Sequence, residues 1–159
     1  MLKADSFLRH GAWSGAAWDI VVLAHDERHL RRKVLRLEHG DEVMVDFEQA
    51  IALDHGDALV LEDGKLVEIV AEEESLLEIL PRNAVHLAEL CWHIGNRHLA
   101  AQIEQSRVLV QNDHVIKAML EGLGAHAHVV CEPFHPIRGA YAPPSAHGHG
   151  HGLGHSHDH

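Results

Sequence analysis

Residues 76–134 read LLEILPRNAVHLAELCWHIGNRHLAAQIEQSRVLVQNDHVIKAMLEGLGAHAHVVCEPF, and strand-like and helix-like patterns alternate along them. Two pieces carry apolar side chains at helical spacing. These positions are Val85, Ala88, Cys91, Trp92 and Ile94 in the piece 82–98, and Val115, Ile116, Met119, Leu120 and Leu123 in the piece 113–123. Short β-rich runs precede, separate and follow them, at 76–80, 102–104, 107–110 and 128–134. The order β-α-β-β-α-β predicts a ferredoxin-like arrangement for this half of the chain.

The ends of both predicted helices carry specific signals. Gly95-Asn96 predicts the end of the first helix, because glycine and asparagine tolerate the left-handed backbone at a helix terminus. Asn112 or Asp113 predicts the N-cap of the second helix, and Gly124 predicts its end. Both helices therefore have boundaries that can be checked residue by residue.

The first half of the chain has strand patterns. In the segment DEVMVDF, residues 41–47, the alternation places Val43, Val45 and Phe47 on one face. The dipeptide Asp63-Gly64 lies between two β-rich runs and predicts a hairpin, with positive φ expected at both turn positions. We therefore expect an all-β unit before the mixed one.

Together these patterns predict an α+β protein in three parts. Residues 1–73 are expected to form a small all-β N-terminal domain, which either binds a partner or only supports the fold. Residues 74–141 are expected to form a ferredoxin-like domain. Residues 142–159 are expected to form a disordered His-rich tail, because glycine and histidine cannot bury a core.

The tail carries the clearest chemistry of the chain. Imidazole is the commonest protein ligand for nickel, copper and zinc, and glycine leaves the backbone free to bring neighbouring rings onto one ion. A purification tag is the alternative interpretation, although tags are usually uninterrupted histidine runs. The candidate metal ligands of the tail are His147, His149, His151, His155, His157 and His159.

Composition limits the possible partners and the compartment. The 159 residues carry a formal charge of −11 with histidines neutral, which argues against nucleic acid or an anionic membrane surface as a partner. The N-terminus has charges at Lys3, Asp5 and Arg9 and no apolar run, and the longest apolar stretches are far too short to span a membrane. A cytoplasmic location is expected.

Sequence signatures of catalysis are missing. The chain has no HExxH, GxSxG, P-loop or dinucleotide-binding glycine motif, so we do not expect an enzyme. Cys91 and Cys131 have no metal-binding spacing and lie in apolar stretches, which predicts buried, inert thiols.

Several histidines outside the tail are candidate ligands. His98 follows the expected helix end, so it is either an ordinary surface histidine or half of a two-imidazole site on the axis of a twofold dimer. Asp113 and His114 offer a carboxylate and an imidazole side by side, or simply a helix cap and an exposed first-turn residue. His126 and His128 lie two residues apart in a strand, so they share a face and either chelate a metal or are merely exposed. His86 and His93 are too far apart for one metal and are expected to be structural.

With these residues in view, the chain resembles the UreE family of urease accessory proteins over nearly its whole length. The resemblance rests on HIGNRHLAAQIEQ at 93–105, DHVIKAMLEGLG at 113–124 and FHPIRGAYAP at 134–143, followed by the His-rich tail. It implies a homodimer with a β-rich N-terminal domain and a ferredoxin-like metal-binding domain. It also implies that His98 is the nickel ligand that both subunits contribute at their interface. Asn112-Asp113-His114 stands where some relatives carry His-Asp-His, so a separate site there would be weakened.

The family binds nickel and delivers it to the urease apoenzyme together with a GTP-hydrolysing accessory protein. The sequence hypothesis is therefore a cytoplasmic, dimeric Ni(II) chaperone whose tail captures ions and passes them to the paired His98 site. Zn(II) and Cu(II) are expected to compete, following the Irving–Williams order. A divalent-metal storage or detoxification buffer that acts through the tail is the first alternative. A metallohydrolase with an unrecognised three-ligand site is the second.

Overall fold

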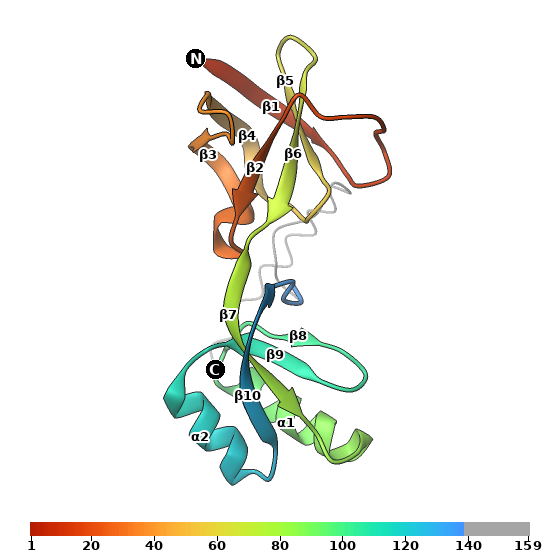
Figure 1. Cartoon of the computed structure of the whole chain (residues 1–159), viewed down its shortest axis with the longest axis vertical. Coiled ribbons are helices and arrows are strands. Elements are labelled where there is room, and N and C mark those ends of the chain that lie inside the picture. Colours follow the sequence, from red (N-terminus) through yellow and green to blue (C-terminus); the bar gives the residue numbers. More distant parts are fainter. Residues whose placement is uncertain (139–159) are drawn as a thin grey trace, which may run out of the picture.

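The structure, a computed structural model, describes residues 1–138. In this part the chain forms two lobes stacked along its long axis (Figure 1). Strands β1 to β6 build the sheet of the first lobe, and β7 to β10 build the sheet of the second. Strand β7, Glu73–Leu80, leads from the first lobe into the second. A two-unit α+β architecture is therefore confirmed.

The N-terminal lobe is a six-stranded sheet with the order β2-β6-β5-β1-β4-β3. Its predicted apolar face is confirmed, because Val43, Val45 and Phe47 are all buried in its core. The bounds are β1 Leu2–Leu8, β2 Asp19–Leu23, the short helix η1 Asp26–Arg28, β3 His29–Arg36, β4 Glu42–Ala52, β5 Ala58–Leu61 and β6 Leu66–Ala71.

The predicted hairpin around Asp63-Gly64 is present between β5 and β6, which pair antiparallel. The expected turn type is wrong, because Gly64 has φ +88° while Asp63 does not adopt positive φ. The Gly64 N–H donates to the Leu61 carbonyl at 2.9 Å, and the Leu61 N–H donates to the Lys65 carbonyl at 2.9 Å. These bonds describe a three-residue loop in which only the last residue needs glycine.

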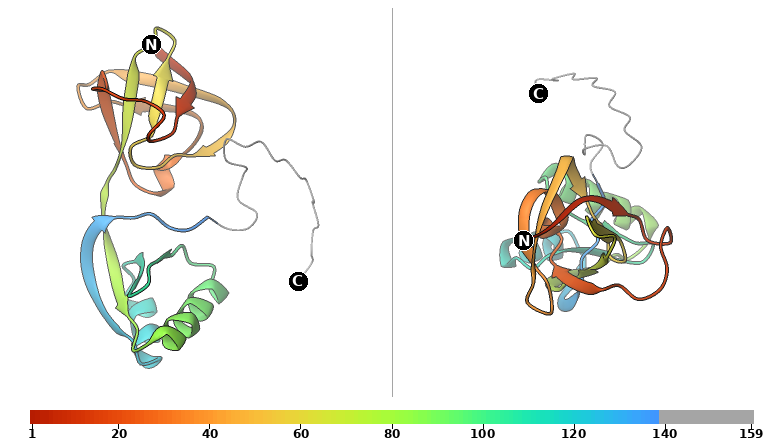
Figure 2. Two further views of the ribbon diagram at one scale, coloured as in Figure 1. Left: turned by 90° about the vertical axis from the view of Figure 1, so that its right-hand side faces the viewer. Right: turned by 90° about the horizontal axis from the view of Figure 1, so that it is seen from above.

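The C-terminal lobe runs in the order β7, α1, β8, β9, α2, β10, as predicted, and its strands form an antiparallel sheet in the order β10-β7-β9-β8. Both helices pack on the same face of this sheet, through a core that joins Leu90 and Leu120 to Ile79 and Ala127 (Figure 2). The bounds are α1 Ala84–Asn96, β8 Gln102–Ile103, β9 Val108–Gln111, α2 His114–Gly122 and β10 His126–Pro133.

The buried face of α1 differs from the prediction. Val85 and Trp92 are 70% and 65% exposed, and Ile94 is the predicted position that is buried. The other buried residues of the helix are His86 and Leu90. His86 can be buried because both ring nitrogens have partners: Nδ1 accepts the Arg82 N–H at 2.9 Å, and Nε2 donates to the Leu123 carbonyl at 2.9 Å. The structural role predicted for His86 is thus confirmed, and the helix is rotated away from the expected stripe. On α2, Val115 is likewise exposed.

The two thiols are not both buried. Cys91 is half-buried on α1, and burial raises its pKa. Cys131 is exposed, so the prediction of two buried thiols is wrong for this residue. The reason is its place near the end of β10, where neighbouring side chains such as Val129 are also open to solvent. None of the helices in residues 1–138 is long and apolar enough to cross a membrane.

Candidate metal-binding site

His98 lies directly after α1 and closes a Schellman motif. Arg97 is the C-cap of the helix, the His98 N–H donates to the Gly95 carbonyl at 3.0 Å, and the Leu99 N–H donates to the Ile94 carbonyl at 3.4 Å. Leu99 and Ile94 belong to the same apolar cluster, which is the hydrophobic contact that accompanies this motif. The backbone that carries the His98 ring is therefore fixed by hydrogen bonds and by packing.

The backbone of His98 is left-handed. Its φ is +58°, and it is the only residue other than glycine with positive φ in the part of the chain that the structure describes. The prediction that Gly95 or Asn96 would take this conformation is wrong, because both still belong to the helix. Helix α2 ends in the same motif, but there the left-handed residue is Gly124, with φ +87°.

A histidine at this position costs more than a glycine, since the left-handed backbone brings Cβ close to a carbonyl oxygen. His98 is exposed, and none of the side-chain hydrogen bonds within residues 1–138 involves its ring. Backbone strain held in place around a free functional side chain is a feature of ligand sites. The arrangement therefore offers an imidazole on a rigid base, with one lone pair that nothing in residues 1–138 engages.

Asp113 and His114 occupy the first turn of α2. The Asp113 side chain is the N-cap, and its Oδ1 accepts the N–H groups of Val115 at 2.8 Å and Ile116 at 3.1 Å. His114 is exposed on the first turn. Asn112 is bonded through its side-chain amide to the Ser75 hydroxyl at 3.1 Å. The capping role of Asp113 is confirmed, and Oδ2 is the oxygen that remains for a ligand.

The two candidate regions meet at one hollow. Leu99 and Ala100, which follow His98, line a hollow of about 270 Å³ together with Asn112, Asp113 and Ile116. The fold thus brings the end of α1 and the start of α2 to one place on the lobe. Across residues 1–138, no group of three or more His, Cys, Asp or Glu side chains is arranged to hold a metal ion.

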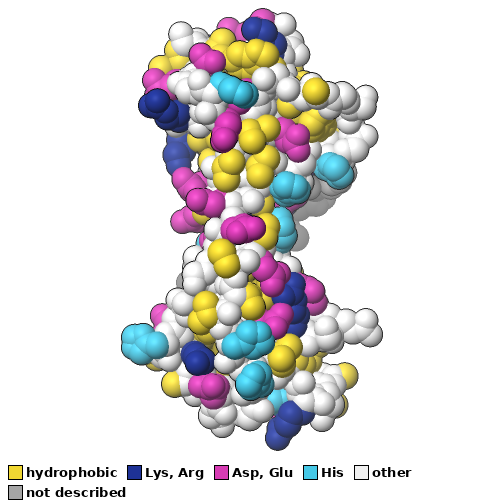
Figure 3. Space-filling model, in the orientation of Figure 1, with side chains coloured by type: hydrophobic (Ala, Val, Ile, Leu, Met, Phe, Trp, Pro, Cys, Tyr) yellow, Lys and Arg dark blue, Asp and Glu magenta, His cyan; other side chains and the backbone are white. Residues whose placement is uncertain are grey.

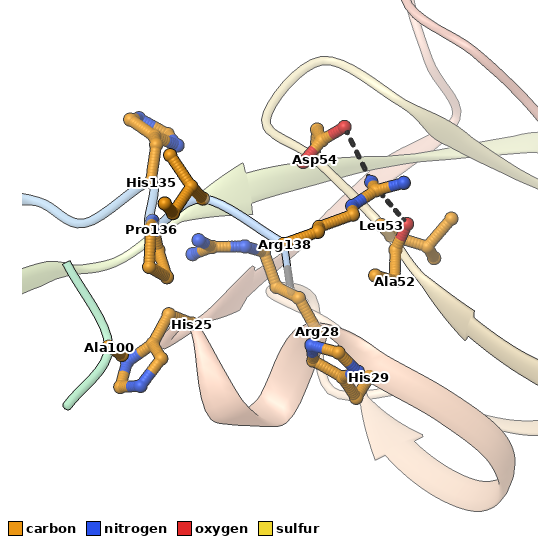
Figure 4. Close-up of a pocket in the computed structure, with 11 residues that line it drawn as sticks. His25, Arg28, His29, Ala52, Leu53, Asp54, Ala100, His135, Pro136 and Arg138 are labelled. Carbon is orange, nitrogen blue, oxygen red and sulfur yellow. Dashed lines mark hydrogen bonds and ion pairs between the residues drawn. The ribbon is translucent and has the colours of Figure 1, made fainter. Parts of the chain in front are cut away.

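A second pocket, of about 290 Å³, lies where the two lobes join (Figure 4). Three histidines line it, and sequence spacing gave no indication of this, because His25 and His29 precede His135 by more than a hundred residues. Burial lowers the pKa of His135, and the nearby positive charges of Arg28 and His55 lower it further. The His135 ring is therefore held toward its neutral form.

Two arginines form hydrogen bonds that connect the lobes at this junction. Arg28 is buried, and its guanidinium donates to the Leu23 carbonyl at 3.1 Å and to the Phe134 carbonyl. Arg138 donates to the Ala52 carbonyl and to the Asp54 carboxylate, both at 3.1 Å (Figure 4). The last described residues are thus bonded to the N-terminal lobe. The predicted tail ligands, from His147 to His159, lie outside the described residues.

Comparison with known proteins gives a consistent result along the chain. Residues 4–72 match the model of the UreE urease accessory protein N-terminal domain, and residues 74–159 match that of the C-terminal domain. The urease accessory protein UreE of Rhizobium rhizogenes is 56% identical over 148 residues, covering 93% of this chain and 87% of the relative.

Two further relatives have the same name. The UreE of Agrobacterium fabrum is 52% identical over 93% of this chain and 90% of its own length. The UreE of Brucella anthropi is 59% identical over 79% of this chain and 74% of its own length. The chain therefore belongs to the UreE family of urease accessory proteins, and this membership confirms that it is not itself an enzyme.

Proposed function

We propose that this urease accessory protein is a Ni(II) chaperone, with His98 as its delivery ligand. The observation that carries the proposal is the left-handed backbone of His98 at the end of α1, where the matching position of α2 is glycine. A ligand role explains why a histidine holds this strained backbone while no hydrogen bond within residues 1–138 engages its ring. Nickel is the cargo, and neutral imidazole is a ligand that binds and releases it.

We propose a homodimer that pairs the two His98 rings across a twofold axis. One imidazole cannot hold a metal tightly, and a self-complementary interface supplies the second. Val85 and Trp92 on α1 and Val115 on α2 are exposed apolar side chains on the helical face of the C-terminal lobe. Exposed aromatic and aliphatic groups of this kind support burial against a second copy.

The domain plan belongs to the same proposal. The order of elements and strands in the C-terminal lobe supports a ferredoxin-like metal-binding and dimerisation domain at 74–141. The six-stranded lobe supports an N-terminal domain at 1–73 that offers a partner surface. Asp113 Oδ2 and His114 are proposed as auxiliary ligands near the hollow after His98.

We propose that the tail, 142–159, feeds the His98 site. His147 lies nine positions after Arg138, which at full extension span about 30 Å, and His159 lies 21 positions after it, which span about 70 Å. A tether of this kind keeps the effective concentration of the tail imidazoles in about the millimolar range. The candidate ligands of the tail are those named from the sequence, His147, His149, His151, His155, His157 and His159.

The proposed recipients are the urease apoenzyme and its GTP-hydrolysing accessory protein, in the cytoplasm. Zn(II) and Cu(II) are proposed competitors, because the Irving–Williams order favours copper over nickel at such ligands. The six tail imidazoles also support the rival function, a divalent-metal buffer in which His98 has no role.

Nickel titration by calorimetry, together with mass determination by light scattering, separates the two functions. The full chain is compared with a chain in which the six tail histidines are alanine, each with and without His98→Ala. We expect the tail-substituted dimer to bind one nickel ion tightly, and His98→Ala to abolish this tight binding while the mass stays that of a dimer. A tail-substituted dimer without a tightly bound nickel ion would establish the buffer instead.

A further inference from the structure

A second metal site is suggested by His126 and His128, which lie on the outer face of the C-terminal sheet. They start β10, and Ala127 between them points into the core under the helices. Their rings therefore project from the opposite face of the sheet. Strand β10 is also the edge opposite β8, the strand that follows His98. Figure 3 shows histidine, acidic and basic side chains together on the face of this lobe that carries β10.

The distance between the two rings suits a shared ion. Their centroids are 5.7 Å apart, with the ring planes inclined at 47°. A metal at about 2.1 Å from an imidazole nitrogen lies about 3.2 Å from the ring centroid, so two rings on one ion have centroids up to about 6.4 Å apart. The observed separation lies inside that limit. Both side chains are accessible, because His126 is exposed and the side chain of His128 is 44% exposed.

Glu78 supplies the supporting contact that metal-binding histidines usually have. It faces His128 across the β7–β10 ladder, and its Oε1 lies 2.8 Å from His128 Nε2. A hydrogen bond from Nε2–H to this oxygen leaves Nδ1 as the nitrogen with a free lone pair. The other carboxylate oxygen, Oε2, accepts from Arg107 Nη1 at 2.7 Å, so the carboxylate itself is held in place.

The surrounding charge favours a cation. Arg107 is also paired with Glu132 at 2.8 Å and with Glu104 at 3.0 Å, so three carboxylates surround one guanidinium. This cluster therefore has an excess of two negative charges beside the two imidazoles. If the contact between His128 and Glu78 were only a structural ion pair, it would need neither the neighbouring His126 ring nor the two excess negative charges.

We propose that His126 and His128 form a two-imidazole site for a late first-row divalent cation, nickel, copper or zinc, with Glu78 as the positioning residue. Two protein ligands and water make an exchangeable site, in agreement with the lack of any three-ligand group in residues 1–138. This site is separate from His98, and the inference does not depend on the proposed function.

The test reads individual imidazoles in the full-length chain. The six tail histidines are replaced by alanine, Ni(II) is titrated, and the carbethoxylation of each remaining histidine by diethyl pyrocarbonate is measured by mass spectrometry. We expect His126 and His128 to become protected together, with one midpoint. His128→Asn should raise the nickel concentration at the midpoint of His126 protection at least tenfold. Glu78→Gln should raise the midpoint for both rings by about tenfold.

His29→Asn, at an exposed histidine of the other lobe, is the matched control and should leave the midpoint unchanged. Circular dichroism melting confirms that each variant is folded. Protection of His126 that survives His128→Asn would overturn the proposal, and so would the absence of protection at both rings. His98→Ala leaves this midpoint unchanged if the proposal is right, so failure of the His98 site and failure of this one are distinguishable.

Discussion

Replacing His98 by glycine should stabilise the C-terminal lobe while removing the proposed nickel ligand. The left-handed backbone, with φ +58°, costs a side chain with Cβ about 1–2 kcal/mol. Glycine avoids this cost but loses about 0.5–1 kcal/mol through the greater freedom of its unfolded chain. The difference predicts that His98→Gly is about 0.5–1 kcal/mol more stable than His98→Ala, which keeps Cβ and also removes the ring.

Urea unfolding of the metal-free protein measures this difference, followed by helical circular dichroism, because α1 and α2 both lie in the C-terminal lobe. Gly124→Ala is the reciprocal control at the matching position of α2. It should destabilise the lobe, since φ there is +87° and an added Cβ would lie 3.3 Å from the Arg82 guanidinium. If His98→Gly is no more stable than His98→Ala, the left-handed conformation and the strain argument are both refuted.

Three further predictions concern the cap, the lobe junction and pH. Asp113→Ala should lower the free energy of unfolding in urea by about 1 kcal/mol, because two N–H groups lose their acceptor. Asp113→Asn should retain most of the stability of the unsubstituted protein, because the amide oxygen can still accept. Arg28→Met should cost about 2 kcal/mol and increase proteolysis between the lobes, because the buried Phe134 carbonyl loses the Arg28 donor and the Leu23 carbonyl keeps only the Glu72 N–H. Because the pKa of His135 is lowered in the folded protein, the contribution of its neutral ring to the free energy of unfolding is complete above about pH 6.5. This contribution is lost as the pH falls through the pKa of the folded state. His135→Gln should flatten that loss in urea titrations between pH 7.5 and 5, and an unchanged slope would contradict it.

Local signals in the sequence were sufficient for much of the fold. Alternation identified the buried face of β4, and the Asp63-Gly64 dipeptide located the β5–β6 hairpin. Capping chemistry placed the start of α2 at its observed residue, since Asp113 is the N-cap. These features depend on a few neighbouring residues, which is why one sequence is enough to predict them.

Features that depend on tertiary contacts were not predictable in the same way. The turn of the hairpin has one positive φ instead of two, and the left-handed residue after α1 is His98 instead of Gly95 or Asn96. The contact between His128 and Glu78 needs the register of β7 against β10, which no spacing in the sequence specifies. The pocket at the lobe junction likewise gathers histidines from distant segments.

The wrong face predicted for α1 is informative about partners. The sequence pattern grouped Val85 and Trp92 with the core, yet both are exposed, while Leu90 and Ile94 carry the packing against the sheet. A helix that carries more apolar residues than its buried stripe contains also has an exposed apolar surface, which another molecule can bury. Periodicity alone cannot separate a stripe that packs inside one chain from a stripe that packs against another. Because the exposed stripe runs along the helix that ends two residues before His98, the same misassignment supports the proposed interface at that residue.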